Sequence, residues 1–109
     1  MAVTTAREVF ESHMPTRLQE KPQLQAQVNA IYKFAVQGEG GGTWLVDLTQ
    51  PGGKVAEGDG EAACTVTVGA DTLVAVVNRQ TNAQRAFMTG KIKVSGDMKL
   101  AMKLTALLA

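Results

Sequence analysis

The chain has very few of the side chains that bind metals or act as nucleophiles. It contains one cysteine, Cys64, and one histidine, His13, which excludes an internal disulfide and a metal site built from several histidines. Cys64 falls in the apolar phase of residues 64–68, which predicts a buried and unreactive thiol. His13 has no cysteine or serine partner at a known catalytic spacing, and we expect it at the end of a helix.

Long apolar runs are absent as well. No run approaches the ~20 residues of a membrane-spanning helix, and the N-terminus lacks the basic region and apolar block of a signal peptide. With 109 residues, of which 45% are hydrophobic and 19% charged, the sequence predicts one soluble domain that spans residues 1–109. We therefore expect a cytoplasmic protein.

No group of residues in the sequence argues for catalysis or for a bound cofactor. The glycines of residues 38–42 lie between two predicted strands, without the helix start or the Gly-Lys-Ser/Thr ending of a phosphate loop. Acidic residues are scattered, so no general acid and base pair stands out. The sequence therefore predicts a protein that is not an enzyme and uses no cofactor or metal.

Acidic residues dominate the first part of the chain and basic residues the last part. Residues 1–78 hold five Lys or Arg against nine Asp or Glu, and residues 79–109 hold six against one. In one account the acidic and basic residues form two solvated faces that neutralise each other. In the other, the basic residues form a face that contacts lipid headgroups, acyl-CoA phosphates or an anionic membrane. Nucleic acid is a poor candidate partner because the basic segment lacks interleaved aromatic residues. The candidates for headgroup or membrane contact are Lys91, Lys93, Lys99 and Lys103.

Helix signals flank the predicted strands. A capping box at Thr5 begins a helix that we expect to end at Pro15, and residues 16–21 form a loop or a further turn. Pro22 can begin a second, short helix. Residues 71–78 are ambiguous, since the acidic first residue favours a helix start whereas the valines favour a strand.

Five segments have the alternating apolar pattern of half-buried strands. They are residues 30–37, 43–49, 54–57, 62–68 and 91–95. The connections between the first four are of hairpin length, which predicts an antiparallel meander. The third segment is short and weak, which is typical of an edge strand. Helices should cover one face of the sheet.

The last quarter of the chain combines a short helix, a strand and an apolar helix. Asn82 can cap the short helix at its start and Gly90 at its end. From Asp97 onward apolar residues follow a helical stripe, and Met98 and Met102 lie beside it. That second apolar flank packs on another helix, forms the wall of a lipid-sized cavity or docks on another subunit.

A resemblance to a known family rests on three segments. They are residues 43–48 (TWLVDL), 63–68 (ACTVTV) and above all 86–104 (AFMTGKIKVSGDMKLAMKL), and in this order they resemble the sterol carrier protein-2 (SCP-2) domain. The resemblance implies an α/β (α+β) fold: a five-stranded, mostly antiparallel sheet covered on one face by helices, with a hydrophobic tunnel between the layers. It also implies that residues 71–78 are helical and that the tunnel binds fatty acids, fatty acyl-CoAs, sterols or phospholipids.

The chain departs from the pattern of this family in two places. Residues 79–83 read Arg-Gln-Thr-Asn-Ala where the family usually has Gly-x-x-Asn-Pro, so the adjoining tunnel wall can differ in shape. The chain also ends without the peroxisomal Ser/Ala-Lys-Leu address of eukaryotic members. We therefore expect a free-standing protein of the bacterial type.

Strand phase and the helical stripe nominate side chains for the tunnel wall. For each of them plain core packing is the alternative. The competing function is a structural or interaction module that docks on an enzyme partner or forms a homodimer through its C-terminal apolar helix. The candidates for the wall are Phe34, Trp44, Val46, Val76, Phe87, Ile92, Met98, Met102 and Leu104.

Overall fold

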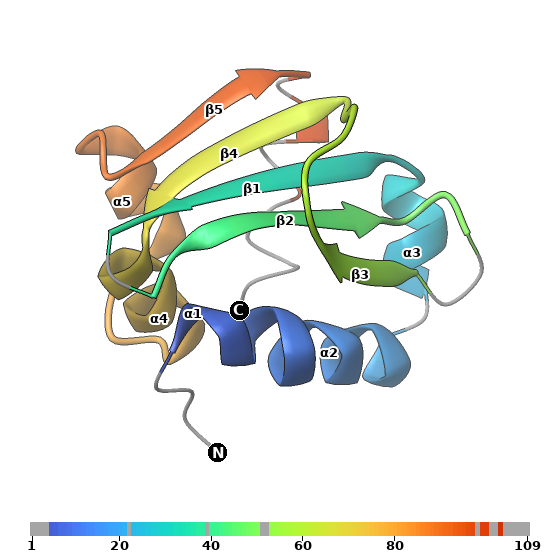
Figure 1. The fold of residues 1–109 in the computed structure, drawn as a ribbon, viewed down its shortest axis with the longest axis horizontal. Helices are drawn as coiled ribbons and strands as arrows, with labels where there is room; N and C mark the ends of the chain where they lie inside the picture. The colour runs from blue at the N-terminus through green and yellow to red at the C-terminus, as the bar shows by residue number, and fades with distance from the viewer. Residues whose placement is uncertain are drawn as a thin grey trace.

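The structure, a computed structural model, describes residues 5–21, 23–38, 40–50, 53–97, 99, 100 and 103. Helices from the start of the chain and from its second half cover one face of a five-stranded sheet (Figure 1). In chain order the elements are α1 (Ala6–Glu8), the π-helix η1 (Val9–His13), α2 (Met14–Glu20), α3 (Gln23–Val28), β1 (Ile31–Gln37), β2 (Gly42–Asp47), β3 (Lys54–Glu57), β4 (Cys64–Gly69), α4 (Ala70–Val77), α5 (Ala83–Met88) and β5 (Ile92–Gly96).

The N-terminal helix begins as the sequence predicts and then runs through its proline. The hydroxyl of Thr5 accepts a hydrogen bond from the backbone N–H of Glu8 at 3.3 Å, which confirms the cap. The predicted helix end at Pro15 is wrong, because α2 continues to Glu20, through the segment where the sequence predicts a loop or a further turn. In η1 the helix widens, so that Met14 donates to the carbonyl of Val9, and the proline then occupies the first turn of α2, where a missing N–H is tolerated.

The sheet has the strand order β3-β2-β1-β4-β5. Neighbouring strands are antiparallel except for β1 and β4, which run parallel. The sheet is therefore mostly antiparallel, as the resemblance implies, but the predicted meander of the first four strands is wrong. A meander would place β4 beside β3, whereas residues 58–63 carry the chain across the sheet to the free edge of β1 (Figure 1).

Side-chain burial explains why β4 pairs with β1. The edge strand β3 is short and mostly exposed, so a strand beside it would gain little apolar burial. Beside β1 the buried residues come into register, because Val66 pairs with Phe34 and Val68 pairs with Val36. The pairing therefore gives the sheet one continuous apolar face.

The crossing segment, residues 58–63, covers part of the outer face of the sheet, opposite the helices (Figure 1). Lys33 of β1 forms an ion pair with Asp59 there. A Cβ atom on Gly60 would lie only 2.8 Å from a methyl carbon of Leu45, so the segment lies directly against β2. This contact explains why Leu45, on the outer face, is still partly buried.

Aromatic rings join the N-terminal helix to the inner face of the sheet. Phe10 of η1 stacks on Trp44 of β2, with ring centroids 4.9 Å apart and planes inclined by 12°. It also meets Phe34 of β1 in an edge contact at 5.2 Å. The three side chains are at most 5% exposed, which places the core between the helices and the sheet.

Both predicted caps of α5 are present. The side-chain oxygen of Asn82 accepts a hydrogen bond from the N–H of Gln84 at 2.7 Å. At the other end Gly90 has φ +80°, and the N–H of Lys91 donates to the carbonyl of Ala86 at 2.8 Å. This is the Schellman arrangement, and it turns the chain directly from α5 into β5.

Replacing Gly96 by alanine should lower the free energy of unfolding by about 2 kcal/mol or more. Gly96 ends β5 with φ +111°, and a Cβ atom there would lie 2.4 Å from the carbonyl oxygen of Ala63. Gly58→Ala is the matched control, since Gly58 has φ +138° and open space around its Cβ position. Urea unfolding followed by circular dichroism measures both variants, and equal losses would show that the backbone contact has no effect.

Candidate functional site

The inner face of the sheet and the helices above it enclose a continuous apolar layer. Five of the predicted wall residues lie in it, each at most 5% exposed: Phe34, Trp44, Val46, Val76 and Ile92. Among the residues that the structure describes, no charged side chain is buried there. Burial of this kind is expected both of a tunnel wall and of plain core packing.

Phe87, another predicted wall residue, lies outside this buried layer. Its side chain is 40% exposed on α5, and that of Met88 is 79% exposed. Ala83 and Ala86 take the inward positions of this helix. Because successive side chains of an α-helix are about 100° apart around its axis, Phe87 points to a different side than Ala86. The predicted wall residues Met98, Met102 and Leu104 lie outside the described residues.

Tyr32 is an interior residue that the sequence analysis did not nominate, although it shares the strand phase of Phe34. Its hydroxyl donates a hydrogen bond to the backbone carbonyl of Leu100, which joins the central strand to the segment after β5. Burial raises the pKa of the Tyr32 phenol above its ordinary value, and the nearby Cys64 and Asp97 raise it further. The phenol is therefore neutral and can donate at physiological pH.

Tyr32→Phe should lower the free energy of unfolding at neutral pH by about 1 kcal/mol, since the carbonyl of Leu100 loses its donor. The raised pKa adds a pH dependence. The contribution of the neutral phenol is fully present below the ordinary pKa of 10.0 and falls above it by about 1.4 kcal/mol per pH unit. Urea unfolding at about pH 8 and pH 11 should show the difference between wild type and variant shrinking, and a constant difference would contradict this coupling.

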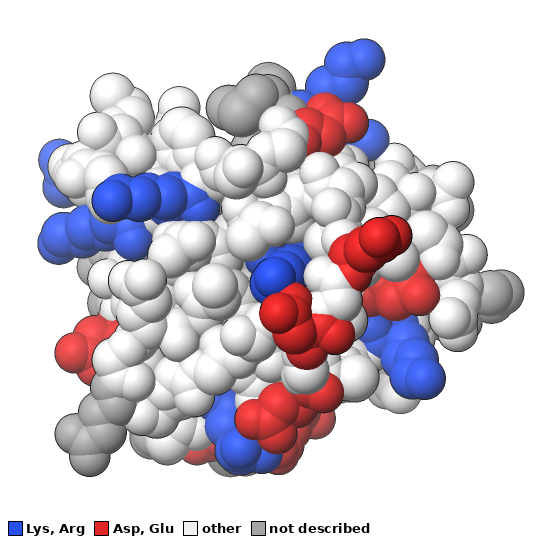
Figure 2. All heavy atoms as spheres, turned by 45° about the horizontal axis from the view of Figure 1, so that its top comes forward, with Lys and Arg blue, Asp and Glu red and all other residues white. Residues whose placement is uncertain are grey.

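The four lysines predicted to contact headgroups or a membrane are exposed but do not form one patch. Lys91 and Lys93 lie at the start of β5, next to α5. Basic side chains gather at this end of the molecule (Figure 2). Lys103 instead donates to the backbone carbonyl of Gln27 in α3 at 2.9 Å, and Lys99 is exposed after β5.

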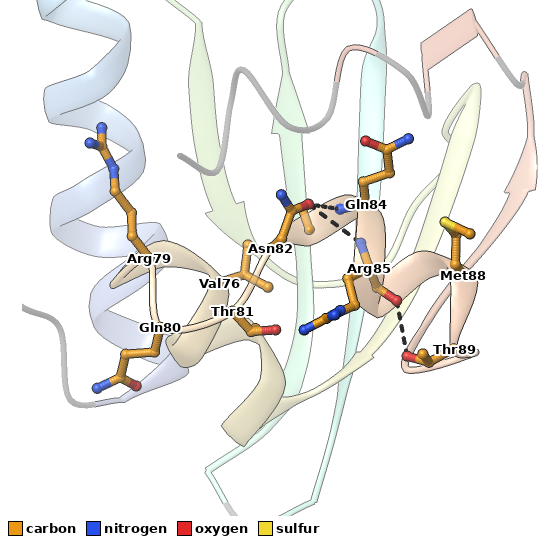
Figure 3. A pocket seen from close by; sticks show the side chains of 10 residues that line it. Val76, Arg79, Gln80, Thr81, Asn82, Gln84, Arg85, Met88 and Thr89 are labelled. Atoms are coloured by element: carbon orange, nitrogen blue, oxygen red, sulfur yellow. Dashed lines mark hydrogen bonds between the residues drawn. The ribbon is translucent and has the colours of Figure 1, made fainter.

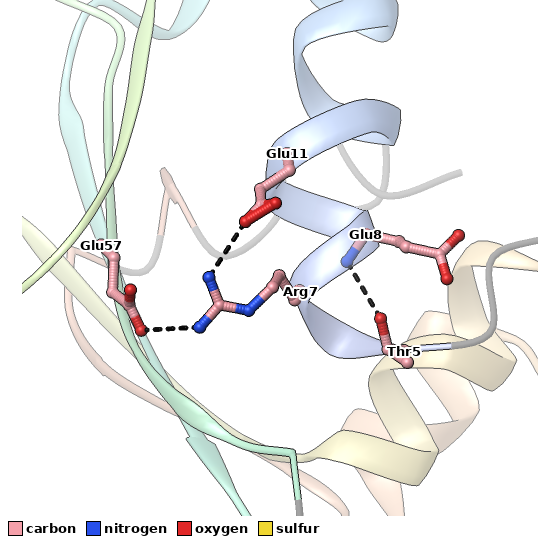
Figure 4. A network of polar contacts seen from close by, with 5 residues as sticks. All are labelled: Thr5, Arg7, Glu8, Glu11 and Glu57. Atoms are coloured by element: carbon pink, nitrogen blue, oxygen red, sulfur yellow. Dashed lines mark hydrogen bonds and ion pairs between the residues drawn. The ribbon is translucent and has the colours of Figure 1, made fainter.

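A network of exposed charges connects α1 to the edge of the sheet (Figure 4). Arg7 donates to Glu11 at 3.0 Å and to Glu57 of β3 at 3.3 Å. Its guanidinium also lies 5.4 Å from the ring centre of Trp44, a cation–π contact. Because the paired side chains are more than half exposed, the ion pairs contribute little to stability.

The chemistry of Cys64 matches its predicted inertness. The thiol is buried on β4, and burial, followed by the charge of Asp97, raises its pKa. The described residues contain no group of three or more His, Cys, Asp and Glu side chains that could hold a metal ion. No helix among them is both long and apolar enough to span a membrane.

A groove of about 830 Å³ opens between the end of α4 and α5 (Figure 3). Residues 79–85 line it together with Val76, Met88 and Thr89. Of these the sequence analysis nominated only Val76, although it noted that residues 79–83 depart from the pattern of the resembled family. The groove adds a polar opening beside the apolar layer.

Arg79 ends α4 in a conformation that favours glycine. Its φ is +60°, and it follows Asn78, the last residue before the turn. The N–H of Gln80 donates to the carbonyl of Ala75 at 2.8 Å, and that of Arg79 to Val76 at 3.1 Å, so Arg79 occupies the position where a Schellman motif usually has glycine. Helix α4 confirms the helix that the resemblance implies for residues 71–78, one residue earlier than predicted.

Arg79→Gly should raise the free energy of unfolding by about 1 kcal/mol, because it removes the cost of a left-handed non-glycine residue. Arg85→Gly is the matched control. The same substitution within helix α5 should lower stability by about 1 kcal/mol. Thermal unfolding of both variants measures the two changes, and destabilisation by Arg79→Gly would show that the side chain makes contacts worth more than the strain.

The helix-covered sheet and its apolar interior define a small α+β domain, and comparisons with known proteins identify its family. The SCP-2 sterol transfer family model matches residues 12–109, so the chain belongs to this family. Sterol carrier protein 2 of Gallus gallus is 35% identical over 112 residues, which cover 94% of this chain and 20% of that protein. Hydroxysteroid dehydrogenase-like protein 2 of Mus musculus is 38% identical over 81 residues, which cover 72% of this chain and 16% of that protein.

The chain therefore spans about a fifth or less of the length of these two curated relatives. A solved structure matches it from end to end. The solution structure of sterol carrier protein-2 from Aedes aegypti, in complex with the C16 fatty acid palmitate, has a TM-score of 0.77 and 29% sequence identity, and the match covers 100% of this chain and 97% of that one. The five-stranded SCP-2-like fold is thereby confirmed.

Proposed function

We propose that this chain, over residues 1–109, is a non-enzymatic lipid carrier that binds the acyl chain or sterol body of its ligand in the apolar layer between the helices and the sheet. The observation that carries the proposal is the continuous buried apolar face of the sheet in a member of the SCP-2 family. The palmitate complex of the Aedes aegypti protein supports it. The ligand classes are fatty acids, fatty acyl-CoAs, sterols and phospholipids.

The energy of burial is sufficient for such a ligand. Burying one methylene contributes about 0.8 kcal/mol, so a C16 chain of the palmitate type gains on the order of 12 kcal/mol before the costs of ordering and association. A net binding energy of about 8 kcal/mol corresponds to a micromolar dissociation constant. A carrier has to release its ligand, and a moderate affinity of this size allows that.

The packing of the aromatic rings sets a condition on binding. Phe10 contacts both Phe34 and Trp44, so an acyl chain can lie beside these rings only if the helix moves away from the sheet. An open void of about 300 Å³ would cost on the order of 7 kcal/mol, a large part of the stability of a small domain. The free protein is therefore collapsed, hydrated or occupied by a lipid taken up in the cell.

The proposal also covers the exposed lysines and the location of the protein in the cell. Lys91, Lys93 and Lys99 are exposed and are proposed contacts for an anionic headgroup or a transient contact with an anionic membrane; Lys103 joins them only if it leaves its bond to Gln27. A free-standing, bacterial-type protein in the cytoplasm stays a prediction, since the two vertebrate relatives described above are several times longer.

A second candidate function is supported by the surface of α5. Phe87 and Met88 are both exposed there, at 40% and 79%, and large exposed apolar side chains side by side are typical of contact surfaces. They favour an interaction module that docks on an enzyme partner or on a second copy of the chain. The two functions differ in whether an acyl chain is bound in the apolar layer.

Trp44 allows a direct test, because it is the only tryptophan of the chain and lies in the apolar layer. Dibrominated stearic acid, whose bromine atoms quench a ring that they contact, should quench the fluorescence of Trp44 strongly, while ordinary stearic acid should bind without such quenching. Native mass spectrometry of gently purified protein should show a lipid-mass adduct that disappears on delipidation. A dimer without a lipid adduct, together with unquenched Trp44 fluorescence, would contradict the lipid-carrier function and favour the interaction module.

A further inference from the structure

The groove between α4 and α5 has a chemistry that acyl-chain burial does not use. Its charged lining residues, Arg79 and Arg85, are both positive, and none of the lining residues that the structure describes is acidic. Amide and hydroxyl side chains fill most of the remaining wall, among them Gln80, Thr81 and Gln84. The groove therefore offers many hydrogen-bond donors and a net positive charge.

The two arginines are available to a ligand. None of the ion pairs among the described residues includes Arg79 or Arg85, and both side chains are exposed. In Figure 3 Arg85 extends from α5 toward Thr81, whereas the side chain of Arg79, at the end of α4, extends away from Arg85. A guanidinium presents its N–H groups in a planar fork that matches the oxygens of a phosphate.

The groove borders the apolar layer. Val76 and Ala83 line the groove and also belong to the buried core, where they are 1% and 7% exposed. The volume of about 830 Å³ lies in the range of sites that hold a drug-sized ligand, which is more room than a single carboxylate needs. The groove thus has room for a bulky anionic head, beside the interior where the apolar tail is proposed to lie.

We propose that this groove binds the phosphate ester headgroup of an amphipathic ligand, with Arg79 and Arg85 as its phosphate-binding residues. The inference rests on the proposed function for the position of the acyl chain, and it adds where the head lies and which chemistry is recognised. Two sources carry this chemistry: a phosphorylated lipid and the phosphates of a fatty acyl-CoA.

The test compares wild type with the Arg79→Gln/Arg85→Gln variant in calorimetric titrations with monomeric palmitate, palmitoyl-CoA and palmitoyl lysophosphatidic acid. The affinity of the variant for at least one phosphate-bearing ligand should be about tenfold lower. Its affinity for palmitate should stay within about twofold of wild type. The matched control is Lys21→Gln/Lys54→Gln, which removes two exposed cations at the end of α2 and on β3 and should change none of the affinities by more than about twofold.

The outcomes distinguish the two sources of the phosphate, and they also distinguish failure of the headgroup site from failure of the proposed carrier function. A loss confined to palmitoyl-CoA identifies the nucleotide phosphates, and a loss confined to lysophosphatidic acid identifies a phosphorylated lipid; both support the inference. Unchanged affinities for both overturn it, while palmitate binding to wild type still supports the proposed carrier. Titration of wild type with coenzyme A, which has no acyl chain, tests the groove without the variant and without binding in the apolar layer. The phosphates of coenzyme A should shift the backbone amide resonances of residues 80–85 in wild type, and if neither it nor lysophosphatidic acid does so, the inference is overturned.

Discussion

The contact of Phe10 with Trp44 and Phe34 is the interaction on which the rest of the structure depends. It joins the N-terminal helix to the first two strands, and the exposed ion pairs of Arg7 beside it add little. Stacked and edge-on aromatic rings stabilise such a contact beyond the area they bury. The same rings line the layer where an acyl chain is proposed to lie, so ligand binding and helix–sheet packing use the same apolar surface.

The position of β1 explains why a movement of the N-terminal helix away from the sheet would leave the sheet intact. This strand has β2 on one side and β4 on the other, and the crossing segment 58–63 lies over the outer face, where Asp59 pairs with Lys33. The sheet is thus paired at its centre and supported from outside by contacts that no helix makes. Separation of the helices from the inner face would break side-chain packing while the strand pairs remain.

The sequence predicts the strands and the caps well because their signals are local. Alternation over a few residues identifies all five strands, β1 to β5, and Asn82 and Gly90 are recognised by properties of single side chains. Two predictions fail where distant residues decide. The partner of β4 depends on which edge offers apolar burial, and the helix passes Pro15 because η1 widens before it.

The groove is the part of the candidate site that no local pattern predicts. Its lining comes from the end of α4, the turn and α5, and residues 79–83 signalled it only by departing from a family pattern. Arg79 occupies a left-handed position that glycine would occupy without strain, so this side chain lowers the stability of the fold. Strained positions of this kind are often retained at sites of function. Val76 belongs to both parts of the site, since it is buried in the core and lines the groove. A headgroup on an acyl chain beside it would therefore lie next to the turn that carries Arg79.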